Sequence, residues 1–170
     1  MNCKNLKILR IIYCNNVRRL EACLNTLEFK SSQIYASSIV HILEKSGTLL
    51  QRLKLESKNG VEEQEEEEEL KMRVMQFAKI LPLTLQYLDL SYSGLSSYID
   101  ILLNNCDAPL KNLLINHLDD NKTIKALIKF CIRKRTLNYV GISIDTDSHI
   151  KKEVEVYIKL VPSHRITVYC

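Results

Sequence analysis

Apolar and polar residues alternate in short stretches that recur along the chain. In Leu85-Gln86-Tyr87-Leu88-Asp89-Leu90 the leucines stand at positions one, four and six, and polar or amphipathic residues separate them. Alternation with a period of two is typical of a β-strand with one buried face. This stretch therefore predicts a strand that points Leu88 and Leu90 into a core.

The same six-residue pattern occurs six times in nearly constant phase. Its copies begin at Leu6, Leu24, Leu50, Leu85, Leu110 and Leu137. From the second copy onward the leading leucines stand 26, 35, 25 and 27 residues apart. Three of these intervals lie within the roughly 20 to 29 residues of a leucine-rich repeat. Ile166 and Val168 follow Val140 and Ile142 by 26 residues and predict a seventh, terminal strand.

Between the strands, apolar residues follow the spacing of a helix. One face is predicted in the 35-residue interval by Leu70, Val74, Phe77, Ala78 and Leu81. Further helical faces are expected within 34–43, 99–103, 124–131 and 150–158. Ser96 or Ser97 would cap one of these helices, and Asp120 or Asn121 another. The 18-residue first interval predicts only a loop or one helical turn at 15–22.

Strands that alternate with helices predict an α/β fold. We expect a leucine-rich repeat solenoid of about six to seven repeats, with parallel strands on the concave side and helices on the convex side. A chain of 170 residues suits one domain. We therefore assign residues 1–170 to a single leucine-rich repeat domain with an acidic insertion near 59–69.

The charged residues are unevenly distributed. The formal net charge is +4, although seven glutamates lie between Glu62 and Glu69. This unbroken run lacks the alternating oxygen ligands and turn glycine of a calcium loop, so a solvated loop is favoured. Its end should begin a helix, with ion pairs from Glu67 to Lys71 and from Glu69 to Arg73.

Composition and targeting signals favour a cytoplasmic or nuclear protein. No apolar stretch is long enough for a membrane-spanning helix, and no signal-peptide core follows Met1. The six cysteines are then expected as reduced thiols. No arginine-rich run with interleaved aromatic residues occurs, which argues against a nucleic-acid partner.

Cysteine residues near the strands, at Cys3, Cys14, Cys23 and Cys106, accompany repeats of about 26 residues. Together with the segments 83–91 and 161–170, they resemble the leucine-rich repeat region of fungal F-box proteins. The resemblance covers the whole chain and implies substrate recognition for a cullin-RING ubiquitin ligase, in which an F-box binds the adaptor Skp1. The repeats begin at Leu6 and leave no room for an F-box. We expect Skp1 binding only if an F-box lies upstream.

Strand residues between the inward leucines should point onto the concave face. The predicted partner-binding residues are Arg10, Tyr13, Glu28, Lys30, Arg52, Lys54, Glu56, Tyr87, Asp89, Tyr92, Asn116, His117, Tyr139 and Ser143. The tyrosines would anchor an interface, and Arg52 with Lys54 would suit an acidic patch on a partner. The alternative is a merely solvated strand surface.

No motif points to catalysis, a cofactor or a metal. The four histidines share no zinc-like spacing with cysteines, and the four glycines form no phosphate-binding loop. Cys106 and His117 are the one candidate nucleophile and base, without a marked orienting group. The leading hypothesis is a non-enzymatic module that binds a protein partner. A truncated or remnant repeat domain with a structural role is the alternative, and a cysteine-dependent enzyme is a distant third.

Overall fold

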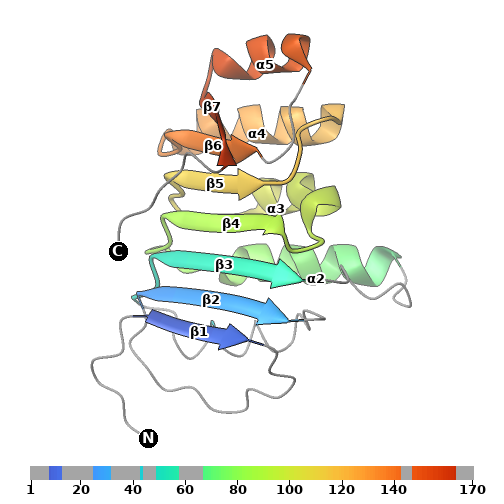
Figure 1. Ribbon diagram of the computed structural model, residues 1–170. Helices are drawn as coiled ribbons and strands as arrows, with labels where there is room; N and C mark the ends of the chain where they lie inside the picture. The colour runs from blue at the N-terminus through green and yellow to red at the C-terminus, as the bar shows by residue number, and fades with distance from the viewer. Residues whose placement is uncertain are drawn as a thin grey trace, which may run out of the picture.

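The computed structural model describes residues 8–12, 25–31, 43, 49–57, 67–142 and 147–163. The strands in this part of the chain are β1 (Ile8–Ile12), β2 (Thr26–Ser31), β3 (Arg52–Ser57), β4 (Tyr87–Tyr92), β5 (Asn112–Ile115), β6 (Tyr139–Ile142) and β7 (Lys159–Pro162). The helical elements are α2 (Glu67–Ile80), η1 (Ser96–Tyr98), α3 (Ile99–Asn105), α4 (Asn121–Lys134) and α5 (Ser148–Glu155) (Figure 1).

The strands form one seven-stranded sheet in which each strand pairs with the next one along the chain. Every pairing is parallel. The register places equivalent positions of the recurring pattern side by side, as in Leu53 beside Leu88 and Leu88 beside Leu113. The α/β fold with parallel strands is confirmed.

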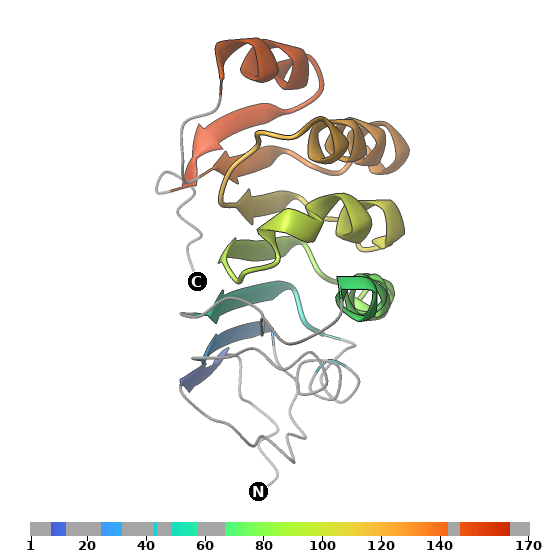
Figure 2. The ribbon, with the colours of Figure 1, turned by 90° about the vertical axis from the view of Figure 1, so that its right-hand side faces the viewer.

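The helices α2, α3 and α4 lie on one face of the sheet, α5 lies beyond the β7 end of the sheet, and the opposite face carries no helix in the described part of the chain (Figure 2). The core lies between the sheet and these helices. Leading leucines such as Leu50 and Leu85 are fully buried there, as are Leu53 and Leu88. Burial of these side chains, each worth about 1.5 to 3 kcal/mol, holds the two layers together.

Helix α4 shows how local sequence sets the helix ends. The Asp120 carboxylate accepts hydrogen bonds from the backbone N–H groups of Lys122 and Thr123, both at 2.8 Å, which confirms Asp120 as the cap. At the other end Arg135 takes a left-handed conformation with φ of 53°, and its N–H donates to the Cys131 carbonyl. The helix therefore ends where the chain turns back toward β6.

Adjacent helices are joined by a charged side chain. Arg133 of α4 donates to the carbonyls of Leu103, Asn104 and Cys106 at the C-terminal end of α3, at 2.8, 3.1 and 3.0 Å. A cation at a helix C-terminus satisfies orphan carbonyls and opposes the negative end of the helix dipole. This contact couples one strand-and-helix unit to the next.

The predicted helices at 70–81, 99–103, 124–131 and 150–158 correspond to α2, α3, α4 and α5. The Glu67–Lys71 and Glu69–Arg73 ion pairs are present in α2, at 2.9 and 2.7 Å. Neither Ser96 nor Ser97 caps α3, because a 3-10 turn over Ser96–Tyr98 precedes it and its N-cap position is Tyr98.

The sequence did not predict β7, which is the seventh strand that the structure describes. The strand beside β6 is β7, with Val140 next to Leu160 and Ile142 next to Pro162. The interval from β6 is thus 20 residues, because α5 has only 8 residues and needs less chain than the longer helices. Ile166 and Val168 lie outside the described residues.

Several other predictions also fall outside the described residues. They concern the first connection at 15–22, the helix at 34–43 except Leu43, the first part of the acidic insertion at 59–66, and the cysteines Cys3, Cys14, Cys23 and Cys170. Cys106 and Cys131 are free, buried thiols. No helix in the described ranges is long and apolar enough to cross a membrane.

Candidate functional site

The face of the sheet opposite the helices carries the strand residues that alternate with the core leucines. Parallel register sorts these residues into rows that run across the strands. One row contains Thr26, Arg52, Tyr87, Asn112, Tyr139 and Lys159. The next row contains Arg10, Glu28, Lys54, Asp89, Leu114, Gly141 and Val161. Polar side chains of several neighbouring strands therefore lie side by side on this face.

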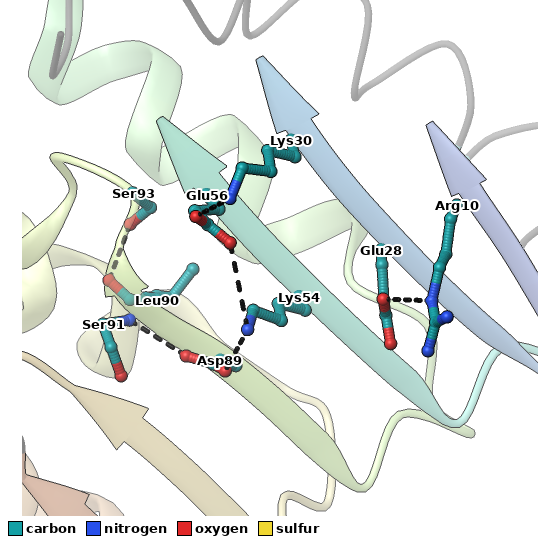
Figure 3. Close-up of polar contacts among 9 residues, drawn as sticks. All are labelled: Arg10, Glu28, Lys30, Lys54, Glu56, Asp89, Leu90, Ser91 and Ser93. Atoms are coloured by element: carbon teal, nitrogen blue, oxygen red, sulfur yellow. Dashed lines mark hydrogen bonds and ion pairs between the residues drawn. The ribbon is translucent and has the colours of Figure 1, made fainter. Parts of the chain in front are cut away.

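Opposite charges pair with one another across β1 to β4, in a set that we call the ionic ladder (Figure 3). Its members are Arg10, Glu28, Lys30, Lys54, Glu56 and Asp89. Arg10 Nε lies 2.6 Å from Glu28 Oε2, and Lys30 pairs with Glu56. Three basic and three acidic groups give the ladder no formal net charge.

Lys54 lies in the middle of the ladder, between two carboxylates (Figure 3). Its Nζ is 3.9 Å from Glu56 Oε2 and 3.8 Å from Asp89 Oδ2. The sequence predicted that Lys54 would meet an acidic patch on a partner, whereas its charge is already balanced within the sheet. A contact of Lys54 with a partner stays a prediction.

Asp89 is the buried end of the ladder, with only 5% of its surface exposed. Its Oδ1 accepts a hydrogen bond from the Ser91 backbone N–H at 3.1 Å. The register shifts at this point, so that Lys54 lies beside Asp89 but Glu56 lies beside Tyr92. The carboxylate thus satisfies a backbone donor at an irregularity of β4, where strand pairing is locally interrupted.

A second set of residues, which we call the cation–aromatic row, occupies the first position of each strand from β3 to β7. It contains Arg52, Tyr87, Asn112, Tyr139 and Lys159. Lys159 Nζ lies 5.7 Å from the centre of the Tyr139 ring, a cation–π distance. Burial raises the pKa of Tyr87, as does the nearby Asp89 carboxylate, while Arg52 opposes this shift. The Tyr87 hydroxyl is therefore neutral at physiological pH.

The backbone beneath the cation–aromatic row is held by paired hydrogen bonds. The Gln51 carbonyl accepts from the N–H groups of Gln86 and Tyr87, at 2.9 and 3.0 Å. The Gln86 carbonyl accepts in the same way from Lys111 and Asn112, at 2.7 and 3.0 Å. Each strand thus begins at a fixed place relative to its neighbour, so the row is positioned by the backbone.

The predicted partner-binding residues are divided between this face and other places. Ten of them belong to its strands: Arg10, Glu28, Lys30, Arg52, Lys54, Glu56, Tyr87, Asp89, Tyr92 and Tyr139. Asn116 and His117 directly follow β5. Tyr13 and Ser143 lie outside the described residues.

Thr26, Asn112 and Lys159 share the first row with Arg52 and Tyr87 but were missed in the sequence. Aligning the six repeats would have found Thr26 and Asn112, which stand two residues after their leading leucines, as Arg52 does. Lys159 follows no such leucine. Only the strand pairing identifies it.

His117 lines a pocket of about 630 Å³ that also contains residues from the N-terminal ends of α2 and α4, among them Glu67, Lys71 and Asp120. Several charged side chains that line this pocket form ion pairs with one another. Lys71 donates to Glu67, which holds the pKa of that carboxyl below its usual value. His117 Nε2 lies 3.4 Å from Asp119 Oδ2.

Cys106, the candidate nucleophile, is fully buried after α3. Burial raises the pKa of its thiol to about 11, which favours the unreactive thiol over the thiolate. The described residues contain no group of three or more histidine, cysteine, aspartate or glutamate side chains that could hold a metal ion.

Comparison with protein-family models, curated proteins and solved structures finds no match to this chain.

Proposed function

We propose that this chain is a leucine-rich repeat solenoid that binds a protein partner on the face of its sheet opposite the helices. One observation carries the proposal: seven parallel strands follow one another in sequence order, and helices α2 to α4 cover one side of them. A fold of this kind grows by adding one strand-and-helix unit to the next. The face without helices is thereby available along the described sheet.

Large amphipathic side chains on this face support a protein partner. Tyr92 and Tyr139 are 57% and 41% exposed, although strands could carry smaller polar residues there. Tyrosine is enriched in protein interfaces because it contributes a large apolar ring and a hydroxyl at little entropic cost. Substrate recognition in an F-box ubiquitin ligase is the form of this function that the sequence resemblance favours.

The proposal is tested by matched surface substitutions. Proteins captured from a cell extract on the immobilised chain would be identified, purified and titrated back against three forms of it. The sheet-face variant carries Tyr92→Glu with Tyr139→Glu. The control carries Met72→Glu with Ile132→Glu, two exposed apolar residues of the helices α2 and α4.

Loss of affinity in the sheet-face variant alone is the expected result. Equal affinity for all three forms, or loss only in the helix-side control, would move the site away from the sheet. Direct capture of Skp1 would support the ligase form of the proposal. Its absence from the captured proteins would leave a binding module without that adaptor.

A further inference from the structure

Helix α2 carries a stripe of exposed residues on its outer side, which we call the outer stripe. Its members are Glu68, Met72, Met75 and Lys79. At about 100° per residue, these positions lie within roughly 60° of one another, on the side of the helix opposite its buried residues. The outer stripe therefore faces away from the core and from the sheet (Figure 2).

Two methionines form the centre of the outer stripe. Met72 is 58% exposed and Met75 is 37% exposed. They stand three residues apart on the helix, so their side chains are neighbours on its surface. Methionine is flexible and is enriched in protein interfaces. The pair thus offers apolar surface that another molecule can cover.

The N-terminal end of the outer stripe is acidic. The sequence places seven glutamates between Glu62 and Glu69, followed by only two basic residues in the next turn, Lys71 and Arg73. Within α2, Lys71 is shared between Glu67 and Glu68, at 2.9 Å from each carboxylate. The Glu68 side chain is also 81% exposed. This end of the helix therefore keeps an excess of negative charge.

The C-terminal end of the outer stripe is basic. Lys79 is the basic residue of the last turn, and the sequence contains no acidic residue between Glu69 and Asp89. Lys79 is exposed and forms no ion pair with another residue of the described chain. Its charge is therefore available to an external carboxylate.

The outer stripe is complementary to itself in the antiparallel direction. Glu68 and Lys79 lie equally far from the midpoint between Arg73 and Val74, and so do Met72 and Met75. If a second copy of α2 runs antiparallel to the first, Glu68 lies opposite Lys79 of the second copy. Met72 then lies opposite Met75 of the second copy. A two-fold axis makes each of these contacts twice.

We infer that two copies of this chain associate through the outer stripes of their α2 helices, which run antiparallel across a two-fold axis. Oppositely charged side chains meet at both ends of the contact, and the methionines pack between them. The helix side of each copy is used, so both sheet faces stay available. The inference goes beyond the proposed function and holds whether or not the sheet face binds a partner.

The outer side of α4 lacks this complementarity. It carries the exposed residues Lys122, Lys125 and Lys129, and no acidic residue occurs in Asn121–Lys134. Antiparallel pairing of two α4 helices would bring lysine opposite lysine, and like charges across a contact are unfavourable. The acidic end of α2 likewise disfavours a nucleic acid, whose phosphates need cations. The pattern of α2 therefore favours a second copy of this chain.

The contact is small, so the dimer is expected to be weak. A helix of 14 residues is about 21 Å long, and one such helix against another buries less surface than a standard stable interface. We expect a dissociation constant of about 100 µM.

Sedimentation velocity of the full chain at low salt, from about 10 µM to about 1 mM, tests the inference through charge reversal. Glu68→Lys makes both ends of the outer stripe basic, and Lys79→Glu makes both ends acidic. Each variant alone therefore places like charges opposite one another. An equimolar mixture of the two variants places opposite charges at both ends. The control is Lys151→Glu, at an exposed position of α5.

The wild type and the α5 control should dimerise with the same dissociation constant. That constant should rise about tenfold or more in each charge-reversal variant alone, whereas the mixture should associate nearly as well as the wild type. The double variant Glu68→Lys/Lys79→Glu should also dimerise again. Salt should weaken the wild-type dimer, because exposed charges are screened. Circular dichroism checks that every variant is folded.

A wild type that stays monomeric at about 1 mM would overturn the inference. Dimerisation that neither charge reversal weakens would move the contact to another surface. If the single variants are monomeric and their mixture also fails to associate, the antiparallel arrangement is wrong.

Discussion

The ionic ladder and the cation–aromatic row occupy the same face of one sheet but use their charges differently. In the ladder, each carboxylate has a cation of a neighbouring strand within 4 Å, and its buried end at Asp89 also satisfies a backbone donor. In the row, Lys159 lies against an aromatic ring and no member is acidic. The same face thus holds carboxylates paired with cations across β1 to β4 and a lysine placed over a tyrosine ring between β6 and β7.

The largest effect on stability is expected at the buried end of the ladder. Asp89→Ala removes a partner of Lys54 and leaves the buried Ser91 N–H without its acceptor, so the free energy of unfolding should fall by about 2 kcal/mol. Asp89→Asn keeps an acceptor for that N–H and should lose about half as much. Urea denaturation measures both variants, and a wild-type midpoint for Asp89→Ala would contradict a stabilising ladder.

A smaller loss is expected in the middle of the ladder. Glu56→Gln removes the charge that Lys30 and Lys54 share, so the free energy of unfolding should fall by about 1 kcal/mol at low salt. In 1 M salt, where the Debye length is about 3 Å, the difference should shrink. Glu155→Gln, at an exposed position of α5, is the control and should be neutral. A loss that does not depend on salt would show that Glu56 acts by packing.

Substitutions in the cation–aromatic row should change binding more than they change the free energy of unfolding. Tyr139→Thr keeps a residue suited to a strand but removes the exposed ring, so the free energy of unfolding should change by less than about 0.5 kcal/mol. Affinity for a captured partner protein should nevertheless fall several-fold, because the exposed ring contributes contact area on the sheet face. A large loss of stability with unchanged affinity for the partner would show that Tyr139 stabilises the fold and does not bind the partner.

The smallest effect on stability is expected from ionisation of Tyr87, which lies where the ionic ladder and the cation–aromatic row meet. Burial and then the Asp89 carboxylate raise its pKa above the unfolded value of about 10. Its contribution to stability is therefore complete below about pH 10 and is lost as the pH rises from there through the folded pKa. Phenolate absorbance should show one tyrosine that ionises late in the folded wild type and is missing in Tyr87→Phe. If the tyrosine missing in Tyr87→Phe ionises near pH 10 in the wild type, as an exposed tyrosine does, the raised pKa of Tyr87 would be contradicted.

Periodicity alone predicted the strands, the core leucines and the positions of four helices, because burial of one face imposes a period that can be read locally. It failed at the last strand. In Lys159–Pro162 the pattern lacks a leading leucine and includes a proline, which a strand at the edge of a sheet tolerates. The short helix α5 also shortened the interval, so extrapolation of the 26-residue repeat pointed too far along the chain.

The candidate site could be predicted only in part. Alternation identified most residues on the sheet face, including Tyr87 and Tyr139, but not which charges neutralise one another. Lys30 and Glu56 are 26 residues apart, and Lys54 and Asp89 are 35 residues apart, so their pairing depends on the register between strands. The separation of ladder from row is a property of that register and was invisible in any single repeat.

The most direct test of the sheet face as a binding site is a map of backbone amide chemical shifts during titration with a captured partner protein. The account predicts that the largest changes lie at Tyr92 and Tyr139 and the residues next to them on neighbouring strands. Smaller changes should occur in the ladder at Glu28 and Lys54, and the helices α2 to α5 should stay nearly unchanged. Largest changes on the helices, with the strands unaffected, would contradict the assignment of binding to the sheet face.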